Sequence, residues 1–206
     1  MAEYNNQKLT GTFYSGASWQ EPWEAKLNQN FKLANAEEIT FLKNKEEKIN
    51  FSFPDLNKKT ISLNDKKFEN KPVIIQVMGS WCPNCMDESA YLADVYKQYK
   101  HQGLEIIALA FEKTTDFEKA KNQVLRLQKR FKMDYTILIT QQTGKDKASE
   151  VLKALNRITA FPTTIFLNKQ HQVVKIHTGF SGPATGNDYE LFKRNTENVI
   201  ERLLKE

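Results

Sequence analysis

From residue 72 onward, the chain alternates between short apolar runs and longer segments in which apolar residues recur every three or four positions. Short apolar runs are typical of strands covered on both faces, and the longer spacing is typical of helices with one buried face. Strands are predicted over residues 73–78, 104–111, 135–140, 164–167 and 173–176, and helices over residues 83–100, 116–131, 147–156 and 189–204. This order predicts an α/β fold with a mixed central sheet flanked by helices.

Two shorter strands are expected before this region. Residues 49–53 alternate between apolar and polar side chains, and after a turn residues 60–63 return as the second strand of a hairpin. Residues 1–45 show no clear period, and we expect short strands or an ordered extension there. The polar segment 44–48 separates the two parts, which predicts an N-terminal extension over residues 1–45 and a domain over residues 46–206.

Composition excludes several classes of protein. The 206 residues include 30 Lys and Arg against 25 Asp and Glu, and this excess of +5 is spread along the chain, so no basic stripe for nucleic acid is expected. The 40% of apolar residues supports a packed core and excludes a disordered chain. No apolar run approaches the ~20 residues of a membrane span, and residues 1–10 lack the basic and apolar regions of a signal peptide. We therefore expect a soluble chain. An exported protein from which the signal peptide has been removed would show the same pattern.

The cysteines give the strongest indication of chemistry. The chain has two, Cys82 and Cys85, in the spacing C-x-x-C. A structural disulfide framework uses more cysteines at wider spacing, and a structural zinc site needs four ligands. We expect the three histidines to bind no metal, and we expect no cofactor. The pair is then either a redox dithiol or a chance pair of buried cysteines, and its position in the chain decides between them.

Cys82 follows the apolar run 73–78 and opens the helix predicted after it. Backbone N–H groups at a helix N-terminus carry partial positive charge, which favours a thiolate over a thiol. Cys85 lies one helical turn further on and faces the sheet. We therefore predict that Cys82 is the attacking nucleophile and that Cys85 is the resolving thiol. Trp81 and Pro83 flank the exposed sulfur with a flat apolar surface, so they are candidate substrate-binding residues.

Two motifs carry a resemblance to a known family. Trp81-Cys82-Pro83-Asn84-Cys85 after one apolar strand and Phe161-Pro162-Thr163-Thr164 before another resemble the thioredoxin superfamily, over about residues 46–206. Finer features resemble its TlpA/ResA-like branch of exported thiol-disulfide oxidoreductases; they are the early hairpin, Glu88, the extra helix and strand within residues 116–140, and Glu112. Residues 78–82 and 178–182 further resemble the TlpA-like proteins of Bacteroidetes.

The resemblance implies a thioredoxin-like fold in which Pro162 follows a cis peptide bond and faces the cysteines. It also implies that the backbone of Phe161 pairs with the partner's chain, which makes Phe161 and Pro162 candidate substrate-binding residues. Thioredoxin has a buried aspartate six residues before its first cysteine, but here that position is Gln76, which cannot accept a proton. Glu112, at the end of the second central strand, is therefore the candidate carboxylate to assist Cys85.

The resemblance also implies protein disulfides as substrates, an exported location in the periplasm or cell envelope, and an origin of residues 1–45 in an upstream domain. We expect a monomer that works as a reductant. Asn84 is neutral, and the charges of Asp87 and Glu88 disfavour the nearby thiolate, which lowers the reduction potential. In an oxidising compartment such a dithiol needs a membrane reductase as its electron donor.

Other functions remain open at this point. A thiol peroxidase would need a P-x-x-x-T/S-x-x-C pocket with a nearby arginine, and Val77 and Ser80 do not form that pattern. A copper-handling protein of this fold would use the wider C-x-x-x-C spacing with a distant histidine. An oxidase or isomerase of the same fold, and a binding module with a vestigial motif, would share this sequence pattern. A dithiol titration distinguishes a redox dithiol from a vestigial motif, peroxide turnover tests the peroxidase, and metal analysis tests the copper-handling protein.

Overall fold

The computed structural model describes residues 2–15 and 19–206. The chain divides into two compact units, Met1–Ala34 and Asn35–Glu206. The second unit thus begins upstream of residue 46, where the sequence predicts its domain, and the origin of the N-terminal segment stays a prediction. Among the described residues, no helix has the length and apolar composition needed to cross a membrane.

The first unit is an antiparallel three-stranded sheet. It contains the strands β1 (Ala2–Asn5), β2 (Lys8–Ser15) and β3 (Trp19–Lys26), in that order in space. Asn6 and Gln7 form the tight turn between β1 and β2 with φ of 49° and 63°, values that suit a two-residue hairpin loop. Aromatic side chains such as Tyr4 and Tyr14 remain exposed on this sheet. The expectation of short strands in this segment is confirmed.

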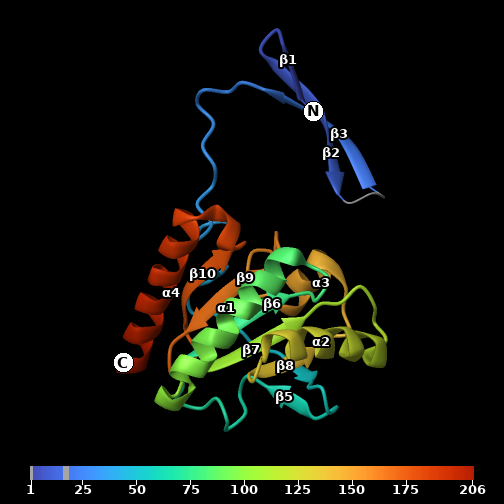
Figure 1. Ribbon diagram of the computed structural model, residues 1–206. Coiled ribbons are helices and arrows are strands. Elements are labelled where there is room, and N and C mark those ends of the chain that lie inside the picture. Colours follow the sequence, from blue (N-terminus) through green and yellow to red (C-terminus); the bar gives the residue numbers. More distant parts are fainter. Residues whose placement is uncertain (1, 16–18) are drawn as a thin grey trace. The chain divides into compact units, whose positions relative to one another are not determined.

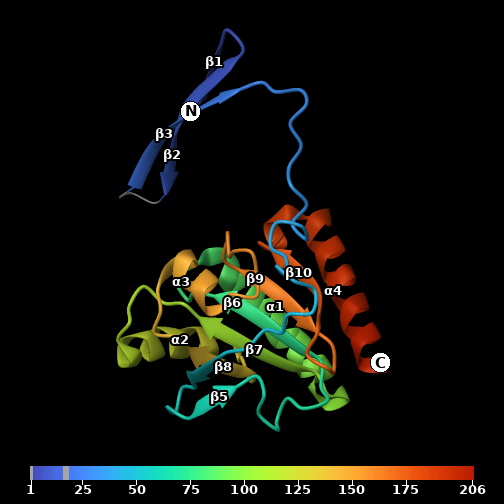
Figure 2. The ribbon, with the colours of Figure 1, turned by 180° about the vertical axis from the view of Figure 1, so that it is seen from behind.

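The second unit is built on the predicted mixed sheet, whose strand order is β10-β9-β6-β7-β8. Its strands are β6 (Val73–Met78), β7 (Glu105–Ala110), β8 (Thr136–Ile139), β9 (Thr163–Leu167) and β10 (Val173–Thr178). The central strand β6 pairs in parallel with β7 and antiparallel with β9. Figures 1 and 2 view this sheet from its two sides. All six residues of β6 are buried, which explains why every one except Gln76 is apolar.

Helices and a hairpin cover the two faces of the sheet. Residues of α1 (Pro83–Tyr99), α2 (Phe117–Phe131) and α4 (Asn187–Lys205) share one apolar core. Residues of α3 (Gly144–Val151) and of the hairpin strands β4 (Ser52–Pro54) and β5 (Thr60–Ser62) belong to the core of the other face. Two short 3-10 turns, η1 (Lys100–Gln102) and η2 (Pro183–Thr185), complete the unit. The predicted thioredoxin-like architecture, with its hairpin and its inserted helix α2 and strand β8, is confirmed.

Two predicted elements have other bounds in the structure. The strand expected over residues 49–53 is β4, which begins only at Ser52. The helix expected over residues 147–156 instead spans Gly144–Val151. After Leu152 the chain turns, and Leu155 forms an isolated bridge with Leu42 in the segment that precedes the hairpin. A tertiary contact therefore ends this helix early, and the local apolar spacing gives no sign of it.

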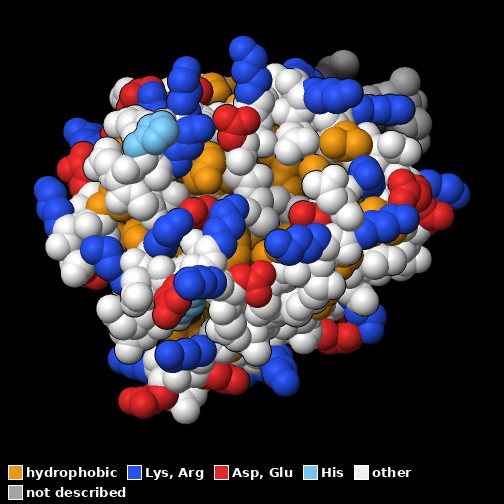
Figure 3. All heavy atoms as spheres, turned by 90° about the horizontal axis from the view of Figure 1, so that it is seen from below, with side chains coloured by type: hydrophobic (Ala, Val, Ile, Leu, Met, Phe, Trp, Pro, Cys, Tyr) orange, Lys and Arg blue, Asp and Glu red, His pale blue; other side chains and the backbone are white. Residues whose placement is uncertain are grey.

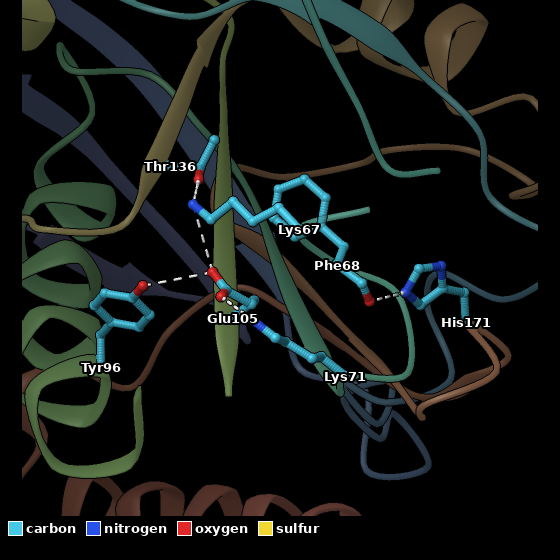
Figure 4. Close-up of polar contacts among 7 residues, drawn as sticks. All are labelled: Lys67, Phe68, Lys71, Tyr96, Glu105, Thr136 and His171. Atoms are coloured by element: carbon cyan, nitrogen blue, oxygen red, sulfur yellow. Dashed lines mark hydrogen bonds and ion pairs between the residues drawn. The ribbon is translucent and has the colours of Figure 1, made fainter. Parts of the chain in front are cut away.

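Glu105 organises the end of the sheet where β6 and β7 begin (Figure 4). Its carboxylate is 7% exposed and accepts a hydrogen bond of 2.8 Å from Lys71, while Lys67 lies 3.5 Å away. Lys67 also donates to the Thr136 hydroxyl at 2.7 Å, and the Tyr96 hydroxyl lies 3.5 Å from Glu105. These contacts attach the loop before β6 to β7, β8 and α1. On the face drawn in Figure 3, basic and acidic side chains are interspersed.

We predict that Glu105→Gln lowers the free energy of unfolding by about 1–2 kcal/mol, because a nearly buried carboxylate with several donors is lost. The matched control is Glu118→Gln, which breaks the exposed pair between Lys58 and Glu118 at 2.8 Å and should leave the unfolding midpoint nearly unchanged, because solvent screens an exposed pair. Urea unfolding measures both. Equal unfolding midpoints for the two variants would contradict a special role of Glu105.

Candidate active site

The two cysteines lie where β6 passes into α1. Cys82 is the N-cap of α1, and its sulfur accepts a hydrogen bond from the backbone N–H of Cys85 at 3.4 Å. Pro83 occupies the first turn, where its missing N–H costs no hydrogen bond. Both cysteines are free thiols; Cys82 is 6% exposed and Cys85 is fully buried. Cys82 therefore keeps a small exposed area, less than the exposed sulfur that the sequence predicts, whereas Cys85 has none.

This arrangement separates the acidities of the two thiols. A hydrogen bond from the Cys85 thiol, helped by the backbone N–H groups of Cys85 and Asn84, lowers the pKa of Cys82 to about 7 against the opposing effect of burial. Burial, together with the neighbouring Cys82 sulfur and its charge, raises the pKa of Cys85 far above its usual range. Cys82 therefore ionises first, and Cys85 stays protonated as long as Cys82 carries a charge.

The loop that precedes β9 lies against Cys82. The Phe161–Pro162 bond is cis, which confirms the prediction, and the Phe161 carbonyl oxygen lies 3.5 Å from the Cys82 sulfur. The Phe161 ring packs between Trp81 and Phe111, with both centroid distances at 5.9 Å. The structure thus brings the predicted substrate-binding residues Trp81, Phe161 and Pro162 together around Cys82.

Trp81 is held in place although it is 41% exposed. Its indole N–H donates to the Phe111 carbonyl at 3.1 Å, and the Lys113 ammonium lies 4.9 Å from the centre of its ring. A Cβ at Gly79 would overlap the indole and lie 3.0 Å from the Phe111 carbonyl oxygen, so only glycine leaves room for this packing. The apolar face beside the reactive sulfur is therefore preorganised.

Glu88 is a buried carboxylate beneath the dithiol. It lies one turn after Cys85 on the inward side of α1, is fully buried, and accepts hydrogen bonds from Gln76 at 2.8 Å and from Thr164 at 2.6 Å. Burial raises its pKa to about 7 against these two bonds, and its charge raises the pKa of Cys85. From the sequence, Glu88 is identified only as a family feature and as a charge in the first turn of the helix. Its three-residue spacing from Cys85 is the sequence feature that indicates a buried position, because it places both residues on the same side of the helix.

Glu112 occupies the predicted place just after β7. It is 2% exposed and accepts two hydrogen bonds of 2.7 Å from Ser80, one from the backbone N–H and one from the hydroxyl. Burial raises its pKa, opposed by both Ser80 bonds. Glu112 thus fixes the loop that leads into Cys82, and its role in proton transfer stays a prediction. Within the described part of the chain, no group of three or more His, Cys, Asp or Glu could hold a metal ion.

An acidic thiol at a helix start, a buried second thiol and a cis-proline loop against the first define a thiol-disulfide oxidoreductase of the thioredoxin fold. Residues 45–176 match the AhpC/TSA family, and the chain belongs to that family. The predicted class of enzyme, a ResA-like thiol-disulfide oxidoreductase, is confirmed by the relatives described next.

Two relatives and one solved structure illustrate the similarity. The chain is 33% identical over 134 residues to the thiol-disulfide oxidoreductase ResA of Halalkalibacterium halodurans, which covers 65% of this chain and 68% of the relative. It is 31% identical over 140 residues to ResA of Bacillus subtilis, covering 68% of this chain and 70% of the relative. A thiol-disulfide oxidoreductase from Bacteroides fragilis shares the fold with a TM-score of 0.53 and 20% identity, over 70% of this chain and 99% of that chain.

We predict that iodoacetamide alkylates Cys82 with a pH midpoint near 7 and leaves Cys85 unreacted at neutral pH. In Cys85→Ala the midpoint should move toward the ~8.5 of an ordinary cysteine, because the main hydrogen bond to the thiolate is lost. Mass spectrometry of the reduced protein after timed quenching identifies the alkylated residue. Equal labelling of both thiols, or an unchanged midpoint in Cys85→Ala, would contradict this account.

Proposed function

We propose that the chain reduces disulfide bonds of exported proteins, with Cys82 as nucleophile and Cys85 as resolving thiol. The observation that carries the proposal is the unequal placement of the two thiols. Cys82 caps the start of α1, 3.5 Å from the Phe161 carbonyl oxygen, and Cys85 is fully buried one turn further on. This placement lowers the pKa of Cys82 to about 7 and raises that of Cys85. A thiol whose pKa lies near the ambient pH combines a useful thiolate fraction with retained nucleophilicity. The cis-proline loop and Trp81 give that thiolate a fixed apolar surface on which a polypeptide can dock.

The reaction proceeds in two exchanges. The Cys82 thiolate attacks one sulfur of the substrate disulfide, that bond breaks, and the departing sulfur takes up a proton. Cys85 then loses its proton and attacks the Cys82 sulfur, which releases the second substrate sulfur as a thiol. The substrate gains two electrons and two protons, and the enzyme is left with a Cys82–Cys85 disulfide.

The second exchange needs a base for the Cys85 proton. Formation of the mixed disulfide removes the Cys82 charge, and that charge is one of the causes of the raised Cys85 pKa. Two buried carboxylates can accept the proton, Glu88 and Glu112. The electrostatics favour Glu88, because its charge acts on Cys85 and its own pKa of about 7 suits proton exchange near neutral pH. Glu112 then acts as a positioning residue through Ser80.

The acidity of Cys82 also supports the reducing direction. The pKa of the attacking cysteine is about 7 in thioredoxin, a reductant, and about 3.5 in a strongly oxidising member of the fold. A thiolate that is less stabilised favours the disulfide form of the enzyme, which makes the dithiol a better electron donor. The same proposal includes a TlpA-like character, an extracytoplasmic location, a monomeric state and a membrane reductase as electron donor. The resemblance to the TlpA/ResA-like branch supports these four points.

The reduction potential tests this direction. Equilibration of the Cys82–Cys85 pair with dithiothreitol should give a potential near the roughly −270 mV of thioredoxin. The reduced protein should cleave the disulfides of insulin, Cys85→Ser should accumulate mixed disulfides through Cys82, and Cys82→Ser should form none. A potential near the roughly −120 mV of the strong oxidases, with rapid oxidation of a reduced unfolded protein, would contradict the proposal. The protein would then act as an oxidase or isomerase and not as a reductant.

Two glutamine variants decide which carboxylate takes the Cys85 proton. In wild-type protein, the rate of mixed-disulfide resolution should rise with pH through a midpoint somewhat below the Glu88 pKa of about 7, because Glu88 accepts a proton only once it is ionised and the mixed disulfide removes the Cys82 charge that helps to raise that pKa. Glu88→Gln should remove this midpoint and slow resolution by about 10- to 100-fold. Glu112→Gln should keep the midpoint. Stopped-flow measurement with a peptide disulfide resolves the step, and loss of the midpoint in Glu112→Gln alone would assign the proton to Glu112.

A further inference from the structure

A groove opens beside the active site on the side lined by α2, and the chemistry above does not use it. Its volume is about 300 Å³, and Trp81, Met86 and Leu127 give it an apolar floor. Arg126 and Arg130 of α2 line its rim and are exposed. Because Trp81 directly precedes Cys82 and Met86 directly follows Cys85, a chain lying in this groove would reach the reactive sulfur within a few residues. We call it the α2 groove.

The α2 groove carries unbalanced positive charge. Helix α2 contains five basic residues and one acidic residue, a net charge of 5 − 1 = +4, and its acidic residue, Glu118, pairs with Lys58. Among the residues that the structure describes, neither Arg126 nor Arg130 has an ion-pair partner. Lys113 adds a further cation over the Trp81 ring. The apolar floor next to the cysteines is thus bordered by cations that pair with no carboxylate in the described part of the chain.

The spacing of the two arginines matches that of an extended chain. Arg126 and Arg130 lie four residues apart on α2, which separates them by about 6 Å along the helix axis. Alternate residues of an extended polypeptide lie about 6.6 Å apart on one side of the chain. Two carboxylates at positions i and i+2 of such a segment can therefore each face one arginine, and arginine binds carboxylates with paired hydrogen bonds.

We infer that the α2 groove binds an extended acidic segment of the protein substrate next to its disulfide. The enzyme then prefers substrates in which two acidic residues, one residue apart, lie close to the reactive cysteine. This inference rests on the proposed function, because it assigns the substrate class of the same site. The docking surface formed by Phe161 and Pro162 remains available to the substrate at the same time.

Peptide mixed disulfides test the preference. Each peptide has one central cysteine joined to 2-mercaptoethanol, with Glu-Ala-Glu on both sides in the first peptide and Gln-Ala-Gln in the second. In single-turnover reactions with the reduced protein and no other reductant, the acidic peptide should react about fivefold faster at low salt. The advantage should disappear at about 0.5 M salt, where exposed charges are screened. A third peptide with adjacent glutamates should show a smaller advantage, because the spacing is lost.

Two charge-reversal variants locate the effect. Arg126→Glu/Arg130→Glu should make the neutral peptide react faster than the acidic one. The matched control, Lys129→Glu/Lys145→Glu, changes the net charge equally at two exposed lysines that do not line the groove, and it should keep the wild-type preference. If the arginine variant does not fold, Arg126→Gln/Arg130→Gln replaces it and should abolish the preference without reversing it.

The failures of the two proposals are distinguishable. Equal rates for the acidic and neutral peptides, or loss of the preference in the lysine control, would overturn the α2 groove as a substrate site. Failure to reduce all three peptides and a neutral small disulfide such as hydroxyethyl disulfide would overturn the proposed function instead.

Discussion

A carboxylate buried among apolar side chains must find its hydrogen-bond donors inside the protein, and Glu88 finds them on two strands. Gln76 of β6 and Thr164 of β9 each donate to one of its oxygens, at 2.8 and 2.6 Å. These bonds join α1, which carries both cysteines, to the centre of the sheet and to the strand that follows the cis-proline loop. The position of Cys82 over Phe161 follows from this anchoring, because both sides of the contact are attached to the same carboxylate.

The different burial of the two sulfurs gives them different acidities and therefore different roles. They belong to one helical turn, yet Cys82 lies at the rim and Cys85 beneath it. A charge at the rim is stabilised by helix N–H groups and the second thiol, whereas a charge on Cys85 would lack water and lie near Glu88. The order of ionisation is therefore a property of the fold around the motif. The residues between the cysteines contribute to it mainly through the N–H of Asn84.

Local patterns predicted most of the fold and part of the site. The apolar runs identified the strands, because strands buried on both faces need apolar residues at most positions, and the cysteine spacing identified the chemistry. The end of α3 was not predictable, since a bridge between Leu155 and Leu42 determines it. The role of Glu88 was hidden because its partners lie 12 and 76 residues away in the chain. The α2 arginines and Trp81 line one groove only because the fold brings two distant segments of the chain together.

Gln76 limits the number of groups that can titrate in the buried site. An amide does not titrate, so the centre of β6 adds no second acid to Glu88, and two carboxyls sharing one pocket would spread their titration over a wide pH range. A single carboxyl switches between its two forms within about two pH units. The charge beneath the dithiol therefore rests on one carboxyl, and because the Cys82 charge is among the causes that raise the Glu88 pKa, the protonation of Glu88 is linked to that of the reactive thiol.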